Sequence, residues 1–179
     1  MNSIKVGAGW TSKPYDGLSQ GRRIQLNNGD LTITRNMRKH VENAGAVIYQ
    51  SGMNISYGNE YINERLMGVH PNYLEIERPT VVEGRFINQL DIREKRKVTI
   101  LNERSVKTLF KHGAKPLGKM LNMGGVMFQV VGVYKDKGNS GGQDVFVPFS
   151  TLQTVYNKGD KLNNILMSIK DLNTEEENK

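Results

Sequence analysis

The sequence contains no cysteine. A disulfide framework, a cysteine-ligated zinc site and a thiol nucleophile are therefore excluded. Uninterrupted apolar stretches reach only a few residues, far below the ~20 that a membrane-spanning helix needs. The first residues also lack the basic and apolar regions of a secretory signal. Taken alone, these absences leave either a cytosolic protein or a fragment whose targeting information lies elsewhere.

Signatures of common catalytic sites are missing as well. Neither the nucleophile pattern G-x-S-x-G nor the phosphate-binding pattern G-x-x-x-x-G-K-[ST] occurs. The three histidines, His40, His70 and His112, are far apart in sequence, and none has a partner at metal-ligand spacing, so we interpret them as surface or capping residues. We expect a protein that is not an enzyme, with no catalytic residue, metal site or cofactor.

What is present indicates one compact folded unit. The chain has 179 residues, of which 37% are hydrophobic, enough to form a core and in the usual size range of one domain. Helices are predicted at 34–44, with Gly45 just past the end, at 103–113 after the N-cap Asn102, and from Ser150, where Gln153 completes a capping-box spacing. Strands are predicted at 46–50, 53–57, 61–69, 97–101, 119–123, 126–134, 144–147 and 164–170. Because strands outnumber helices and do not alternate with them regularly, the predicted class is α+β with a mixed sheet.

Three segments are predicted to lack regular structure or to be incomplete. Residues 135–143 are polar and glycine-rich, so we expect a mobile loop, and 10–28 is also predicted as a loop. Near the end, Thr174 precedes three glutamates in the pattern that begins a helix, yet the sequence stops there. This favours a piece of a longer protein, although a frayed acidic tail has the same composition.

The excess of positive charge is concentrated in one segment. Residues 93–119 include nine Lys and Arg against two acidic residues, in a chain whose formal net charge is +7. Such a segment could contact anionic lipid headgroups or nucleic acid, but a solvated helix face and loop that keep the protein soluble are the favoured interpretation. Nucleic acid is disfavoured because Phe110 is the only aromatic residue there. The candidate anionic contacts are Arg93, Lys95, Arg96, Lys97, Arg104, Lys107 and Lys111.

Ordered blocks in the middle of the chain resemble a known family. Gly68 to Tyr73 is followed by Glu83-Gly84-Arg85-Phe86 with Asp91 shortly after, and then by 98–102 and Leu109-Phe110. Pro116 to Lys119, 128–133 and 147–149 complete the series. In order and spacing, over roughly 30–170, these blocks resemble the periplasmic core domain of MacB-type ABC transporter permeases. The motif residues, expected to be structural, are Gly68, Tyr73, Gly84, Arg85, Phe86, Asp91, Phe110, Pro116, Gly118, Gly132 and Pro148.

The resemblance implies an extracytoplasmic domain at the bacterial inner membrane, inserted between the first two transmembrane helices of a permease. It implies two lobes, a discontinuous βα lobe at 1–80 plus 150–179 and an inserted strand-rich lobe at 81–149. Implied partners are the transmembrane helices of the same permease, a cytoplasmic ATP-binding domain or subunit and a second permease copy. An envelope protein or a lipophilic or peptide cargo would be further contacts. The alternative hypothesis is a free-standing module that binds anionic lipid or nucleic acid through 93–119.

Overall fold

The computed structural model describes residues 2–14, 16–37, 39–135 and 144–170. Its strands are β1 (Asn2–Gly7), β2 (Leu26–Asn27), β3 (Val41–Tyr57), β4 (Glu60–Val69), β5 (Thr80–Gly84), β6 (Val98–Asn102), β7 (Met120–Met123), β8 (Val126–Lys135), β9 (Asp144–Pro148), β10 (Lys161–Leu162) and β11 (Asn164–Ile169). The helices are α1 (Asn28–Asn36), α2 (Tyr73–Glu77), α3 (Gln89–Arg93), α4 (Glu103–Leu109) and α5 (Phe149–Val155), with a 3₁₀ turn at Lys111–Gly113. The predicted α+β class with a mixed sheet is confirmed.

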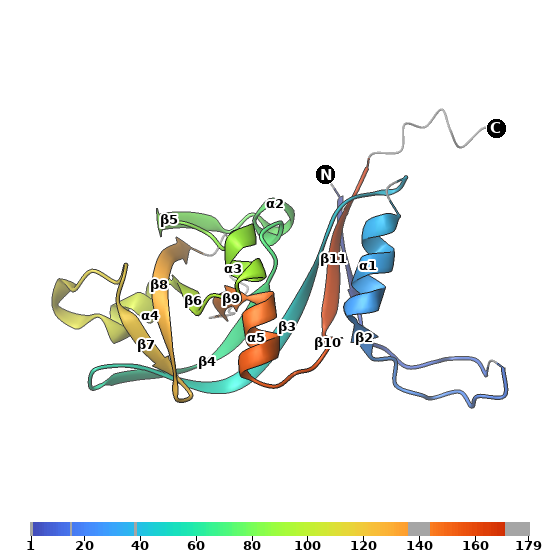
Figure 1. The fold of residues 1–179 in the computed structure, drawn as a ribbon, viewed down its shortest axis with the longest axis horizontal. Coiled ribbons are helices and arrows are strands. Elements are labelled where there is room, and N and C mark those ends of the chain that lie inside the picture. Colours follow the sequence, from blue (N-terminus) through green and yellow to red (C-terminus); the bar gives the residue numbers. More distant parts are fainter. Residues whose placement is uncertain (1, 15, 38, 136–143, 171–179) are drawn as a thin grey trace.

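One sheet of nine strands runs through the molecule. Its order is β1-β11-β3-β4-β9-β6-β8-β5, with β7 pairing beside β3 and β8. The β4–β9 and β6–β8 pairs are parallel, and the remaining pairs are antiparallel. The long strand β3 extends from the region of β1, β11 and α1 to the region of β7, and β4 pairs with its second half (Figure 1). The boundaries predicted for the two lobes therefore lie on a continuous sheet, and the division into lobes stays a prediction.

Both faces of the central strands are buried. Along β3, Val47 packs in one cluster of buried side chains and Ile48 in the other, and Met67 and Leu66 of β4 alternate in the same way. Helices α1, α4 and α5 contribute Leu31, Leu109 and Leu152 to the larger cluster. Residues from α2, β5–α3 and β8, among them Ile76 and Phe86, pack on the opposite side. This alternation follows from the two-residue period of a strand.

The helix predicted at 34–44 is wrong. Helix α1 begins six residues earlier, because Asn27 and Asp30 form a capping box around its N-terminus, and it ends at Asn36. Val41 and Ala44, which share a helical stripe with Met37 in the sequence, lie instead in β3 opposite Ile169 and Met167. Gly45 lies within β3 and is not a helix-terminating residue. Pairing with β11 outweighs a short apolar period that fits either structure.

The other two helices are confirmed, with one correction. Asn102 caps α4, since its side-chain oxygen accepts the N–H of Arg104 at 2.9 Å. Helix α5 forms, but Pro148 is its N-cap and the predicted capping box at Ser150 is wrong. The Ser150 hydroxyl donates to the Ile92 carbonyl at 2.5 Å, and the Gln153 amide donates to Asn28 and to the carbonyl of Lys161. Tertiary partners thus replace the local cap.

The predicted strands are confirmed, except that two of them form one continuous strand. Segments 46–50 and 53–57 are parts of the single strand β3, which contains a register shift between Gln50 and Met53 and a positive φ at Gly52. Elements absent from the sequence-based assignment are β1, β2, β5, β10, α2 and α3. Within 10–28 the chain is irregular up to β2 and the start of α1, as predicted for most of that range. The loop predicted at 135–143, beyond Lys135, and the helix start predicted at Thr174 lie outside the described residues.

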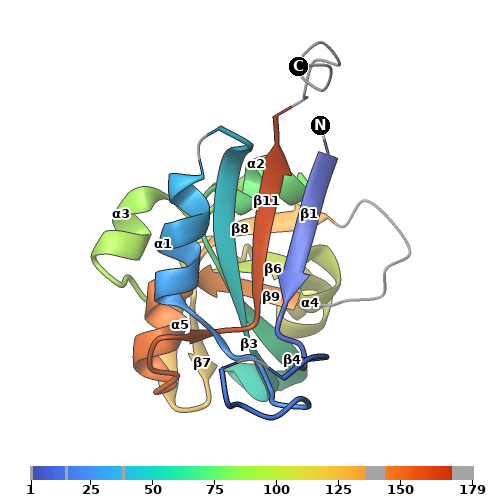
Figure 2. The same cartoon turned by 90° about the vertical axis from the view of Figure 1, so that its right-hand side faces the viewer.

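The first described strand begins, and the last described strand ends, at the same end of the sheet. Strand β1 pairs antiparallel with β11, with Asn2 opposite Ile169, so the start of β1 and the end of β11 lie side by side (Figures 1 and 2). Residues 8–25 form an arm at the opposite end of β1 (Figure 1), held by a bridge between Trp10 and Arg23. No helix among the described residues is long and apolar enough to span a bilayer.

Candidate functional site

The motif around Gly84 forms a very close approach between β5 and β8. Gly84 has φ +70°, and a Cβ there would clash with the Val131 carbonyl oxygen and lie 2.9 Å from Cδ2 of Leu117. A Cβ at Gly132 would likewise clash with the Arg85 carbonyl oxygen. The Arg85 N–H donates to Val131 at 3.0 Å across this contact. Glycine is therefore required at both positions by the backbone itself.

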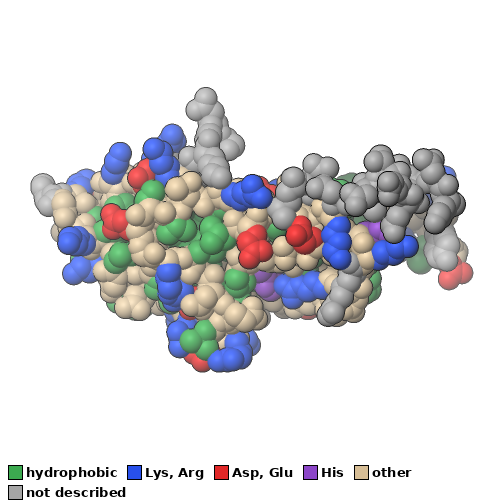
Figure 3. All heavy atoms as spheres, turned by 90° about the horizontal axis from the view of Figure 1, so that it is seen from above, with side chains coloured by type: hydrophobic (Ala, Val, Ile, Leu, Met, Phe, Trp, Pro, Cys, Tyr) green, Lys and Arg blue, Asp and Glu red, His purple; other side chains and the backbone are tan. Residues whose placement is uncertain are grey.

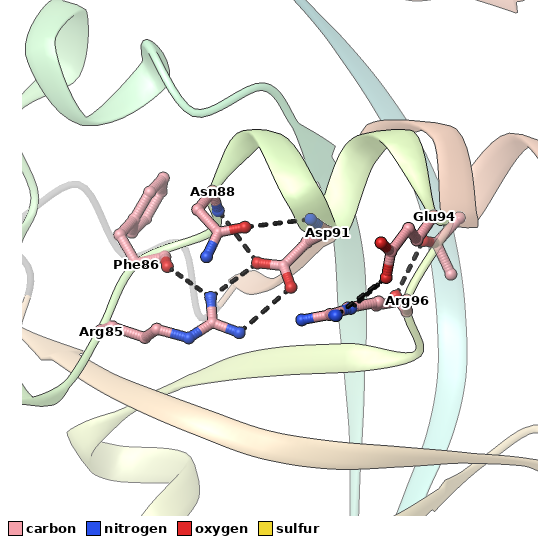
Figure 4. Close-up of polar contacts among 7 residues, drawn as sticks. Arg85, Phe86, Asn88, Asp91, Glu94 and Arg96 are labelled. Atoms are coloured by element: carbon pink, nitrogen blue, oxygen red, sulfur yellow. Dashed lines mark hydrogen bonds and ion pairs between the residues drawn. The ribbon is translucent and has the colours of Figure 1, made fainter.

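A polar network fixes the chain just after this turn. Arg85 donates to both carboxylate oxygens of Asp91, at 2.6 Å and 3.1 Å, and to the Phe86 carbonyl at 3.0 Å (Figure 4). Asp91 also accepts the Asn88 N–H at 2.9 Å, and the Asn88 side chain accepts the Asp91 N–H at 3.0 Å, which makes the capping box of α3. Asp91 is completely buried, so its charge depends on these donors. The network holds Arg85 and Phe86 in one orientation.

Phe86 joins a group of stacked aromatic rings. Its ring centroid lies 5.8 Å from that of Phe146, which lies 5.3 Å from Tyr73 and 4.5 Å from Tyr134. Burial raises the pKa of the Tyr73 hydroxyl far above its ordinary value. Four segments distant in sequence thus meet in one apolar contact, which makes this region a structural centre rather than a reactive one.

The remaining motif residues lie apart from that centre. Gly68 allows α5 to approach β4, because a Cβ there would lie 2.7 Å from Ile48 and 3.1 Å from Leu152. Phe110 is buried with its ring 4.5 Å from Tyr57. Three others mark turns: Pro116 is buried, Gly118 has φ +80° and donates to the Val130 carbonyl, and Pro148 ends β9. Each adjoins a packing contact or a turn.

The candidate anionic contacts form two groups along the chain. Arg93, Lys95, Arg96 and Lys97 precede β6, whereas Arg104, Lys107 and Lys111 follow it, so the strand separates the two groups. Several are already paired: Arg93 and Arg96 lie 3.6 Å and 2.8 Å from Glu94, and Lys111 lies 2.7 Å from Glu60. The basic segment 93–119 therefore consists of two groups whose positive charge is partly neutralised by Glu94 and Glu60.

A cleft of about 690 Å³ opens between α1 and the start of β3 on one side and α2 and α3 on the other. Figure 3 shows the face of the molecule seen from above Figure 1, on which cationic, acidic and histidine side chains lie near one another. The polar lining residues are Arg35, Glu42, Asn43, His70, Asn72, Glu75, Gln89 and Lys170. A volume of this size suits a small molecule or part of a larger one.

His70 lines the cleft, and its interpretation as a surface or capping residue is wrong. It is 9% exposed, its ring stacks on Phe149 with centroids 4.6 Å apart, and Nε2 has no hydrogen-bond partner among the described residues. Burial, assisted by the charge of Arg35, lowers the pKa of His70 to about 3. His70 is therefore neutral at physiological pH. His40 is exposed, as expected.

Two charged contacts near β4 have no sequence signature. Arg65 donates to both oxygens of Asp144 at 2.6 Å and 2.7 Å, which links the parallel strands β4 and β9. Glu64 is 8% exposed, and its carboxylate accepts only the Ser105 hydroxyl, at 2.8 and 2.9 Å, among the described residues. Alternation in β4 could have placed Glu64 on the buried face with Leu66, since the two are two residues apart. Nothing local indicates its partner, which is 41 residues away.

Replacement of Glu64 by Gln should change how stability depends on pH. Burial raises the pKa of Glu64 in the folded state, an effect that Ser105 reduces and Asp144 reinforces. A raised folded pKa gives a stabilising contribution that is full below the ordinary value of 4.5 and is lost as pH rises through the folded value. As the pH rises from 4 to 7, the melting temperature of Glu64→Gln should therefore increase relative to that of the native chain. Calorimetry at several pH values measures this, with the exposed Glu83→Gln as the control; parallel profiles would contradict it.

No group of three or more His, Asp or Glu side chains is placed to hold a metal ion in the part of the chain that the structure describes. The contacts above are those of a packed scaffold, and the cleft beside α1 is one of several pockets on it. Gly84 and Asp91 are motif residues that the sequence predicts to be structural. The cleft has no sequence signature, because its lining residues come from both ends and the middle of the chain.

Comparison with known proteins gives one consistent result. The family model of the MacB-like periplasmic core domain matches residues 2–178. The macrolide export ATP-binding/permease protein MacB of Mannheimia succiniciproducens is 26% identical over 161 residues, 87% of this chain and 25% of that protein. MacB of Bdellovibrio bacteriovorus is 28% identical over 135 residues, 73% of this chain and 20% of that protein. The chain thus spans a quarter or less of these relatives.

Solved structures share the fold. The periplasmic region of MacB from Actinobacillus actinomycetemcomitans has a TM-score of 0.79 at 23% identity and covers 98% of this chain and 78% of its own. The extracellular domain of the ABC-type transporter YknZ from Gram-positive bacteria has a TM-score of 0.73 at 23% identity, over 82% of this chain and 74% of its own. At these identities the likeness concerns the fold.

Proposed function

The chain belongs to the family of MacB-like periplasmic core domains, and on that basis we propose that it is the non-catalytic extracytoplasmic domain of an ABC transporter permease. It would lie at the outer face of the bacterial inner membrane. ATP hydrolysis would belong to a cytoplasmic domain or subunit, and this domain would contact partners or cargo and follow ATP-driven movement of the membrane helices.

The observation that carries this proposal is the pairing of β1 with β11. A domain inserted between two membrane helices must receive and return the chain at one place, and Asn2 lies directly opposite Ile169. Of these two strands, β11 borders β3, which continues with β4 to the far end of the sheet (Figure 1). Movement applied at the paired strands would therefore reach the far end through continuous backbone hydrogen bonds.

The proposed partners follow from this placement. They are the transmembrane helices joined to β1 and β11, the ATP-binding domain or subunit, a second permease copy, and an envelope protein or a lipophilic or peptide cargo. We also propose the two lobes at 1–80 plus 150–179 and at 81–149. The cleft supports this division, because Gln89 and Ile92 of the inserted segment face residues of the flanking segments across it.

The free-standing lipid- or nucleic-acid-binding module is the weaker hypothesis. It needs one continuous cationic surface at 93–119, whereas β6 divides these residues and Glu94 and Glu60 pair with three of them. We therefore retain the permease domain as the proposed function.

Thiol labelling in the parent permease tests the topology. Because the native chain has no cysteine, Lys107→Cys on the exposed side of α4 would introduce a unique thiol in this domain. We expect a membrane-impermeant maleimide to label it in intact spheroplasts. The parent permease without the substitution gives the background, and Thr32→Cys on α1 repeats the test at the other end of the molecule. Labelling only after permeabilisation would contradict an extracytoplasmic position.

A further inference from the structure

The cleft has a cationic side. Arg35 lies in the last turn of α1, and Lys39 and His40 lie in the segment that leads from this helix to β3. Lys170, which follows β11, is joined to this segment because its backbone N–H donates to the His40 carbonyl at 3.1 Å. Arg35 and Lys170 both line the cleft. Two cations from distant parts of the sequence therefore border one cavity.

Arg35 is held in place but not neutralised. Its Nε donates to the Ala44 carbonyl at 3.1 Å, and the Asn72 amide donates to the same oxygen at 2.7 Å, so α1, β3 and the β4–α2 turn are fastened together. Within the described residues, no carboxylate forms an ion pair with Arg35. Desolvation lowers the pKa of Arg35. An anion beside the guanidinium would offset that desolvation.

His70 supplies a second, independent observation. Its side chain is buried and lines the same cleft, yet Nε2 makes no hydrogen bond in the described structure. Most buried polar atoms are hydrogen-bonded, and an unpartnered one marks a place where a ligand or water belongs. The unpartnered Oδ1 of Asn72 differs, because it packs against Gly45.

We propose that this cleft binds a phosphate group, with Arg35 as the principal contact and Lys170 and His70 as further donors. A guanidinium pairs well with phosphate oxygens. A phosphate has several oxygens directed to different sides, which suits donors from α1, β11 and the β4–α2 turn. A carboxylate has only two oxygens, and the Arg35 guanidinium alone would occupy both. It would therefore leave no oxygen for Lys170 and His70. The site extends beyond the proposed function and does not depend on it.

Two acidic residues limit the affinity. Glu42 and Glu75 also line the cleft, and their charges oppose an anion. Binding should therefore be modest and should weaken with salt. Removal of one carboxylate should strengthen it, which provides a variant whose expected effect is opposite to that of Arg35.

Nuclear magnetic resonance on this chain, titrated with inorganic phosphate at constant ionic strength, tests the proposal. The His70 ring signals, assigned with His70→Asn, and the Asn72 amide should shift saturably. Arg35→Gln should weaken binding about tenfold or more, as expected for loss of a charge-assisted contact. Glu75→Gln should tighten it, and Arg104→Gln on α4 is the matched control with no effect. Shifts that do not saturate, or that Arg35→Gln leaves unchanged, would overturn the proposal.

The phosphate could belong to a soluble ion or to a lipid headgroup. Flotation with phosphatidylcholine vesicles, with and without phosphatidylglycerol, separates these sources. Binding that requires phosphatidylglycerol and is lost in Arg35→Gln supports a headgroup, whereas saturation by free phosphate alone supports a soluble anion. Vesicle binding abolished by Arg104→Gln rather than by Arg35→Gln would place anion recognition in the basic segment 93–119 and refute the cleft.

Discussion

Gly84→Val should lower the free energy of unfolding by about 4 kcal/mol, and the melting temperature by about 10 °C for a domain of this size. The valine must adopt φ +70°, which strongly disfavours a β-branched side chain. Its Cβ would also clash with the Val131 carbonyl oxygen and press on Leu117. Backbone strain and steric overlap therefore add at one position. Chemical denaturation and thermal melting measure the effect.

Gly118→Val separates the two causes. Gly118 has nearly the same φ, +80°, but a Cβ there would meet no atom within 4 Å. Only backbone strain acts at this position, so we expect a loss of about 1–2 kcal/mol. Equal losses for both variants would show that the contact with β8 is not needed, and an unchanged melting temperature for Gly84→Val would contradict the role given to this turn.

Asp91→Ala should destabilise the fold by about 3 kcal/mol, because it removes the acceptor from a buried, charge-assisted network. Two hydrogen bonds from Arg85 and one from the Asn88 N–H end on this carboxylate, and Asp91 is 0% exposed. The loss of the capping box would also weaken the start of α3. Urea denaturation compares the variant with the native chain.

The variants Arg85→Ala and Asp91→Asn separate the contribution of the Arg85 hydrogen bonds from that of the Asp91 charge. The Arg85 side chain is 40% exposed, so it can turn to solvent and its own removal should cost less than removal of Asp91. Asn keeps the shape and one acceptor oxygen but not the charge, and we expect an intermediate loss. Greater destabilisation by Arg85→Ala than by Asp91→Ala would contradict a network centred on the carboxylate.

Local sequence patterns were sufficient to predict much of the secondary structure. The strands β4, β6, β8, β9 and β11 are visible from β-branched and aromatic residues between turn signals. The Asn102 cap of α4 is a local interaction. The helix predicted at 34–44 is wrong because local signals conflict there: Met37, Val41 and Ala44 fit a helical period, while Val41 and Ala44 pair with β11.

Composition and near-neighbour spacing are enough to predict the α+β class and to exclude thiol chemistry. The order of the resembling blocks identified the family, which the family match confirms. The tertiary structure was needed to place His70 beside Phe149, Glu64 against Ser105 and Gly84 against Val131. It also assembled the cleft from α1, β3, α2, α3 and the end of β11. Such contacts depend on the packing of segments up to 135 residues apart, as Arg35 and Lys170 are, and no local pattern encodes that packing.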